Sequence, residues 1–187
     1  MREALKWLDG EGLVQIEPNR GAIVRRITLD DVRDLYELRA ELEGYASRRA
    51  ARRIAADGLA EIEAAIVAFD EAVPRAAAGD IDGVRAVNAA NKRIHGAIVR
   101  AAAHDRLEQI LHRTVDVPLV FQAFRRFDRA ELERSNQFHR LVLAALTARD
   151  AARAEALMIE HIAQGRDVLL EAMVDVEDVA AAFGWSS

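Results

Sequence analysis

Residues 84–98, with the sequence VRAVNAANKRIHGAI, carry apolar side chains at the three- and four-residue spacing of an amphipathic helix. Two polar residues, Asn91 and His95, share the apolar stripe with Val87 and Ile94. Because Asn91 and His95 are four residues apart, they lie one helical turn apart on the same face, where two side chains can hold one ion. The stretch therefore predicts a helix that turns two candidate metal ligands toward a core.

Two further histidines, His139 and His161, occupy comparable places on helices predicted later in the chain. His139 shares a stripe with Val142, and His161 lies next to Ile162. Neutral imidazole is the commonest metal ligand, so three histidines converging inside a helical bundle would form a site for a divalent transition ion. The alternative is a set of hydrogen-bonded core histidines, and the spacing alone favours that alternative.

The composition favours one soluble, mostly helical domain. Of 187 residues, 51% are hydrophobic, 30% are charged and only three are proline. The absence of cysteine excludes disulfides and thiolate metal sites. The sequence shows neither an export signal nor a run of roughly 20 apolar residues that could cross a membrane, so we expect a cytoplasmic protein.

Charge is distributed unevenly along the chain. The net charge of −5 argues against coating nucleic acid with the whole surface. Residues 1–26 carry five basic and four acidic side chains, so the net negative charge of the chain lies in residues 27–187. Residues 2–9 predict a helix, and residues 13–17 and 22–26 predict two strands around a turn with a basic tip. Any contact with DNA should be local to this N-terminal end.

From Ile27 onward the pattern predicts an all-α, antiparallel bundle of six helices. Thr28 with Asp31, and Asp128 with Glu131, have the spacing of N-terminal capping boxes. The other expected boundaries are an end near Pro74, starts at Asp80, Asp105 and Asp150, an irregular stretch near Val117 before Pro118, and a last helix to about Met173.

Arg39 falls in the middle of the inward stripe of the first of these helices. A guanidinium on an inward face needs an acidic partner. Glu43, one turn later, is one candidate, and the carboxylate of a ligand bound through two parallel hydrogen bonds is the other.

Enzyme motifs are scarce. The sequence contains no glycine-rich phosphate loop, Gly-x-Ser-x-Gly elbow or His-Glu-x-x-His pair. Ser135 lies four residues before His139, but no third group is evident to orient such a base. A three-histidine metalloenzyme is a further alternative, although no acidic residue lies on the stripes beside the histidines to act as general base. His104 and His112 are expected to be structural or surface residues.

Several segments together resemble one protein family. Residues 2–27, REALKWLDGEGLVQIEPNRGAIVRRI, resemble the end of a GntR-type winged helix, from the recognition helix through the wing. Three later segments resemble the FCD effector domain of the FadR-like branch: DVRDLYELRAELEGYASRRAA (31–51), NKRIH (91–95) and FHRLVLAALTARDAARAEALMIEHI (138–162).

The resemblance implies a partial winged helix at 1–26, an FCD-like effector-binding and dimerisation domain of six or seven helices at 27–175, and a tail at 176–187. It also implies a transcriptional regulator, not an enzyme, that forms a homodimer, binds a DNA operator and responds to a small carboxylate effector. The implied site residues are Asn91, His95, His139 and His161 for a divalent metal, Arg39 for the effector, and Arg2, Arg20 and Gly21 for DNA. Zinc is the favoured metal, with nickel and manganese as alternatives.

Two departures from the family pattern change these expectations. Asn91 stands where aspartate is more common, so the ligand set is neutral and an anionic effector becomes more valuable. The sequence also begins inside the recognition helix, so operator binding should be weak or absent. A regulator remnant without DNA binding is therefore an alternative to a working regulator.

Overall fold

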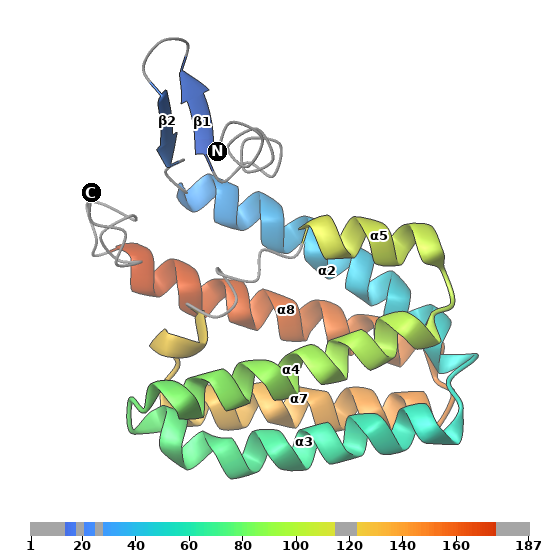
Figure 1. Ribbon diagram of the computed structural model, residues 1–187. Coiled ribbons are helices and arrows are strands. Elements are labelled where there is room, and N and C mark those ends of the chain that lie inside the picture. The colour runs from blue at the N-terminus through green and yellow to red at the C-terminus, as the bar shows by residue number, and fades with distance from the viewer. Residues whose placement is uncertain (1–13, 18–20, 25–27, 115–122, 175–187) are drawn as a thin grey trace.

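A computed structural model of the protein describes residues 14–17, 21–24, 28–114 and 123–174 (Figure 1). The described residues form two strands, six named helices and a short helical turn at 123–126. The helices are α2 (Leu29–Ala51), α3 (Ala56–Ala77), α4 (Ile81–Ala101), α5 (Asp105–Thr114), α7 (Arg129–Thr147) and α8 (Ala151–Val174). The prediction of an all-helical bundle after a small N-terminal hairpin is confirmed.

The hairpin consists of β1 (Val14–Glu17) and β2 (Gly21–Val24), which pair antiparallel with Val14 opposite Val24. Gly21 has a φ of +96°, a conformation that side-chain-bearing residues rarely adopt. Arg2 and Arg20, the expected helix at 2–9, the irregular stretch near Val117 and the tail at 176–187 lie outside the described residues.

The helix starts follow the predicted capping pattern. Thr28 Oγ1 accepts a hydrogen bond of 3.1 Å from the amide of Asp31, whose carboxylate accepts one from the Thr28 amide at 2.9 Å. Asp128 caps α7 with Glu131 in the same reciprocal way. The Asp80 and Asp150 carboxylates accept from amides of the first turns of α4 and α8. These caps fix where the histidine-bearing helices begin.

The expected end of α3 near Pro74 is wrong, because the helix continues to Ala77. Proline removes only its own amide donor, and the following turn still closes through Ala78, whose amide donates to the carbonyls of Pro74 and Arg75. The chain then turns at Gly79, which has a φ of +80°, and Gly83 in the first turn of α4 packs against the end of α3. A Cβ on Gly83 would lie 2.5 Å from the backbone nitrogen of Ala76, so only glycine permits this approach.

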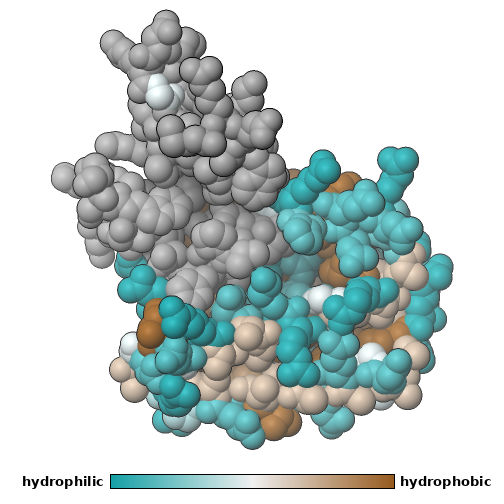
Figure 2. Space-filling view, viewed as in Figure 1, coloured by the Kyte–Doolittle hydropathy of each residue, from teal (hydrophilic) through white to brown (hydrophobic). Residues whose placement is uncertain are grey.

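The bundle consists mainly of two helix pairs, α2 with α8 and α3 with α4, and α7 packs against both α3 and α8 (Figure 1). One continuous core lies between them, and α5 closes a smaller cluster of Ala46, Ala102, Leu107 and Leu111. On the face shown in Figure 2, hydrophobic residues are scattered among hydrophilic ones. Within the described ranges, no helix is both long and apolar enough to span a membrane. Charged and amide side chains also lie inside this core, and they mark the site.

Candidate metal and ligand site

Three histidines converge inside the bundle from three different helices, as the sequence predicts. His95 comes from α4, His139 from α7 and His161 from α8. His161 Nε2 lies 3.2 Å from His95 Nε2 and 3.1 Å from His139 Nε2. His139 is fully buried, and each of the other two is 7% exposed. The three Nε2 atoms therefore meet at one point that is shielded from solvent.

Hydrogen bonds to the outer ring nitrogens orient two of the three imidazoles. His95 Nδ1 contacts the Glu43 carboxylate, and His139 Nδ1 lies 3.1 Å from Asn136 Oδ1. Both partner oxygens are acceptors, since the amide nitrogen of Asn136 is used elsewhere, so each Nδ1 carries the proton and donates. When such a ring is neutral, its Nε2 presents a lone pair to the shared centre, which is the arrangement that metal-ligating histidines have.

This donor arrangement fits a divalent ion. If His161 Nε2 carries a proton, it can donate it to the Nε2 lone pair of either His95 or His139, but not fully to both. Without a cation, one of these two lone pairs therefore lacks a partner. Zinc–nitrogen bonds of roughly 2.0–2.1 Å place ligand nitrogens about 2.9–3.4 Å apart at angles between 90° and tetrahedral, and the two separations here fall inside that range. The residues present therefore suit a metal, and no cysteine competes.

Burial keeps the imidazoles of His139 and His161 neutral, as metal ligands must be. Burial lowers the pKa of His139 well below its ordinary value, and the neighbouring histidines lower it further. The pKa of His161 is lowered in the same direction, first by burial and then by His95 and Arg39.

Glu43 links the histidines to Arg39. Its carboxylate, 3% exposed, accepts a 2.6 Å hydrogen bond from Arg39 Nε and contacts His95 Nδ1 through the other oxygen. Burial alone would raise the pKa of Glu43, but the attraction and hydrogen bonds of His95 and Arg39 outweigh it and hold the pKa well below its usual range. Glu43 lies on α2, so an acidic group reaches His95 from outside the helix stripes that carry the histidines. The four-residue spacing from Arg39 was its only sequence signal.

A second chain of hydrogen bonds runs from His139 to the surface. The fully buried Asn136 donates its amide to the carbonyl of Ile66 at 3.0 Å and to Asp70 Oδ1 at 2.7 Å. Asp70 pairs in turn with Arg140 at the half-exposed edge of α3 and α7. Sequence reasoning missed Asn136, although it shares a helix face with His139 three residues later.

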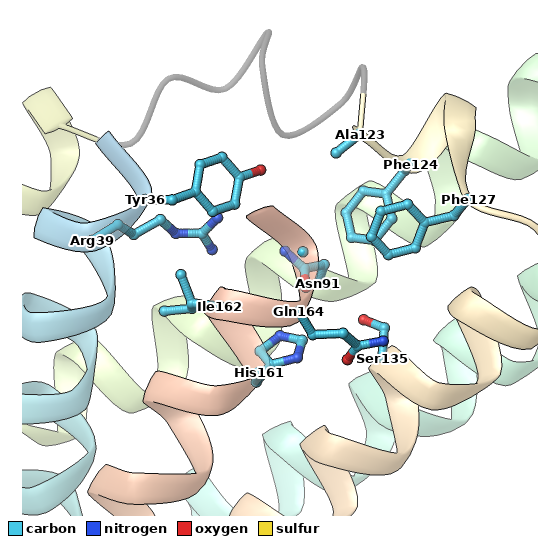
Figure 3. A pocket seen from close by; sticks show the side chains of 11 residues that line it. Tyr36, Arg39, Asn91, Ala123, Phe124, Phe127, Ser135, His161, Ile162 and Gln164 are labelled. Carbon is cyan, nitrogen blue, oxygen red and sulfur yellow. The ribbon is translucent and has the colours of Figure 1, made fainter. Parts of the chain in front are cut away.

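Arg39 and Asn91 line two pockets beside the histidine cluster, of about 370 Å³ and about 890 Å³ when the space open to solvent is included. Both side chains are buried, at 6% and 4% exposure. Burial alone would lower the pKa of Arg39, but Glu43 and Tyr36 outweigh it, so the guanidinium stays charged. Figure 3 shows Arg39 and Asn91 facing the smaller pocket from α2 and α4. Arg39 thus pairs with Glu43, as the four-residue spacing predicts, and its guanidinium also faces a pocket that could hold a ligand.

The remaining polar candidates have other roles. The ring nitrogens of His139 are directed to Asn136 and His161, so His139 is not hydrogen-bonded to Ser135 as a base would be. His104 Nδ1 accepts a 3.3 Å hydrogen bond from the amide of Leu107 and so caps α5. His112 is exposed on α5 at the rim of the larger pocket. Both were expected to be structural or surface residues.

The chain is similar in sequence to a known domain family and to a curated regulator. Residues 34–164 match the FCD domain family. A curated relative from Agrobacterium vitis, an uncharacterized HTH-type transcriptional regulator in the TAR-I ttuE-ttuC' intergenic region, is 34% identical over 103 residues. That match covers 55% of this chain and 58% of the relative, so the chain matches less than two thirds of the relative's length.

Solved structures show the same fold. E. coli McbR/YncC is 23% identical with a TM-score of 0.77, and the alignment covers 91% of this chain and 83% of that one. A putative transcriptional regulator GntR from Rhodococcus sp. RHA1 is 26% identical with a TM-score of 0.65, over 91% and 79% of the two chains. The fold that positions the three histidines is thus one that solved regulators share.

Proposed function

The chain belongs to the FCD-domain family of GntR-type regulators, and from this we propose that it senses a small carboxylate through a divalent metal and so modulates transcription. The relatives named are regulators rather than enzymes. One observation carries the proposal: three Nε2 atoms face one another while hydrogen bonds to Glu43 and Asn136 hold two of the rings in the metal-ligating tautomer.

The metal ligands we propose are His95, His139 and His161, with Asn91 as the fourth. Asn91 is buried one turn before His95 and lines both pockets, although no hydrogen bond joins its amide to the histidines in the described part of the chain. A donor set of three histidine nitrogens and one asparagine oxygen suits zinc first, with nickel or manganese as alternatives. When bound, the ion would supply a positive charge and open positions for an anion.

The charge balance of the site favours an anionic effector. The carboxylate of Glu43 is already matched by the guanidinium of Arg39, which lies within 2.6 Å of it. Three neutral imidazoles and a neutral amide add no further negative charge. A dication would therefore remain uncompensated inside the bundle until an anion enters, and a carboxylate that also reaches Arg39 meets both positive groups.

The regulatory partners follow from the family rather than from the site. We propose that the protein acts as a homodimer on a DNA operator, with Arg2, Arg20 and Gly21 as contacts from the winged helix. Binding of the acid would change operator affinity only if it favours one arrangement of the dimer over another.

The test is calorimetry of zinc-loaded and chelator-treated protein with short monocarboxylates. We expect binding to the zinc-loaded form and at least about tenfold weaker binding to the metal-free form. Arg39→Lys keeps the charge but loses the planar fork, so it should weaken acid binding about tenfold while zinc still binds. Arg48→Lys on the same helix is the matched control, because Arg48 pairs with Glu155 and lines neither pocket.

Two outcomes would contradict the proposal. If zinc-loaded protein binds no acid more tightly than the chelated form, the carboxylate effector is wrong. If Arg39→Lys and Arg48→Lys bind the acid equally well, Arg39 does not receive it.

A further inference from the structure

The smaller pocket contains a buried amide that nothing in the fold satisfies. Gln164 lies on α8 one turn after His161, and its side chain faces the pocket (Figure 3). The residue is 9% exposed, and neither Nε2 nor Oε1 has a hydrogen-bond partner among the described residues. A buried primary amide without partners costs about 1–3 kcal/mol, so such a group facing a pocket needs a hydrogen-bonding partner there.

The chemistry of an amide restricts what that ligand group can be. Gln164 presents a donor through Nε2 and an acceptor through Oε1. A carboxylate can only accept, so it would satisfy Nε2 and leave Oε1 facing a negative charge. A cation would do the reverse. A hydroxyl or a carboxamide both donates and accepts, and either one satisfies both atoms without a net charge.

The surroundings of Gln164 support a neutral polar group. Ser135, 3% exposed on α7, adds a hydroxyl to the same wall, and Figure 3 shows the Gln164 side chain directed toward it. Phe124 and Phe127 close this side of the pocket with ring centroids 5.4 Å apart. The Arg39 guanidinium lies on the other side, next to Tyr36 (Figure 3). The pocket thus has a cationic side and a neutral hydrogen-bonding side.

We propose that Gln164 and Ser135 form a subsite for a hydroxyl or carboxamide group, so that the effector is a small hydroxylated or amidated carboxylic acid. This inference rests on the proposed function, because it assumes that the acid's carboxylate occupies the side of Arg39 and the metal. The pocket is small, which favours short acids over long ones. An unsubstituted acid would fill the same space but leave the amide unpaired.

The experiment measures dissociation constants of zinc-loaded protein for pairs of acids that differ only in hydroxyl groups. Suitable pairs are propionate with glycerate, butanoate with erythronate, and hexanoate with gluconate, and adipate is added as a diacid. Each is titrated into wild type, Gln164→Leu and Gln109→Leu. Gln109 is exposed on α5, so Gln109→Leu makes the same chemical change away from the pocket.

We expect at least one hydroxylated acid to bind wild type and Gln109→Leu about 10- to 100-fold more tightly than its unsubstituted partner. In Gln164→Leu that ratio should fall to about one, through weaker binding of the hydroxylated acid. Retained binding of the unsubstituted acid shows that the variant is folded.

Four outcomes would overturn the inference. Equal binding of both members of every pair by wild type would refute the subsite and leave the proposed function intact. The subsite is also refuted if the hydroxyl preference survives in Gln164→Leu. It is refuted as well if wild type binds adipate more tightly than hexanoate and Gln164→Leu loses that difference. If no acid binds wild type at all, both the subsite and the carboxylate effector fail.

Discussion

Replacing His161 with leucine should remove at least about two thirds of the stabilisation by zinc while leaving the metal-free protein about as stable as wild type. His161 Nδ1 has no partner among the described residues, and its Nε2 faces only the other two histidines. Leucine therefore breaks no hydrogen bond to the surrounding fold, and its apolar burial offsets the lost contact within the cluster to within about 1 kcal/mol.

The zinc-dependent part of the stability should behave differently. At a zinc concentration of about 1,000 times the wild-type dissociation constant, wild type gains about 4 kcal/mol in its free energy of unfolding. Loss of a direct ligand should weaken binding at least about 100-fold, the upper end for an outer-shell partner, so the variant gains no more than about 1.4 kcal/mol. Denaturant unfolding with zinc and with chelator measures both quantities.

His112→Leu is the matched control, because His112 is exposed on α5 and outside the cluster. It should keep the full zinc-dependent gain. If His161→Leu loses several kcal/mol in chelator and wild type gains nothing from zinc, then His161 is a structural core histidine and the metal site is wrong.

Replacing Glu43 with glutamine should destabilise the metal-free protein by about 3 kcal/mol. The Arg39 guanidinium, 6% exposed, would lose its charged partner, and breaking a buried ion pair from one side costs about 3–5 kcal/mol. The same change weakens the orientation of His95, so zinc affinity should fall about 10- to 100-fold as well. Chemical unfolding in chelator gives the first effect and zinc titration gives the second.

The control for this variant is Glu37→Gln, an exposed glutamate on the same helix, which should change stability by less than about 0.5 kcal/mol. A double variant, Arg39→Met with Glu43→Leu, removes both charges and should recover most of the stability lost in Glu43→Gln. A loss below about 1 kcal/mol in the single variant would show that solvent reaches the pair and that it does not organise the site.

Local sequence signals predicted much of this architecture. Thr28, Asp80, Asp128 and Asp150 cap helices where expected, because capping depends on residues within one turn. The inward positions of His95, His139 and His161 follow from helical periodicity in the same local way. Pro74 was misjudged because a proline near a helix end disturbs only one donor, and the final turn closes without it.

The outer parts of the site could not be predicted, because they depend on how the helices are arranged around one another. Glu43 meets His95 across 52 positions in sequence, and Asn136 meets Asp70 across 66. Gln164 lies on the face of His161, but periodicity cannot show that its amide lacks partners. Such contacts arise from tertiary packing of α2, α3, α4, α7 and α8 rather than from any one segment.

The most direct measurement of the central claim is the metal content of protein purified without an affinity tag, before and after incubation with zinc, nickel or manganese. The histidine cluster predicts close to one equivalent of one divalent metal per chain, and its loss in His161→Leu but not in His112→Leu. Less than about a tenth of an equivalent, with no uptake of any of the three ions, would contradict the metal site.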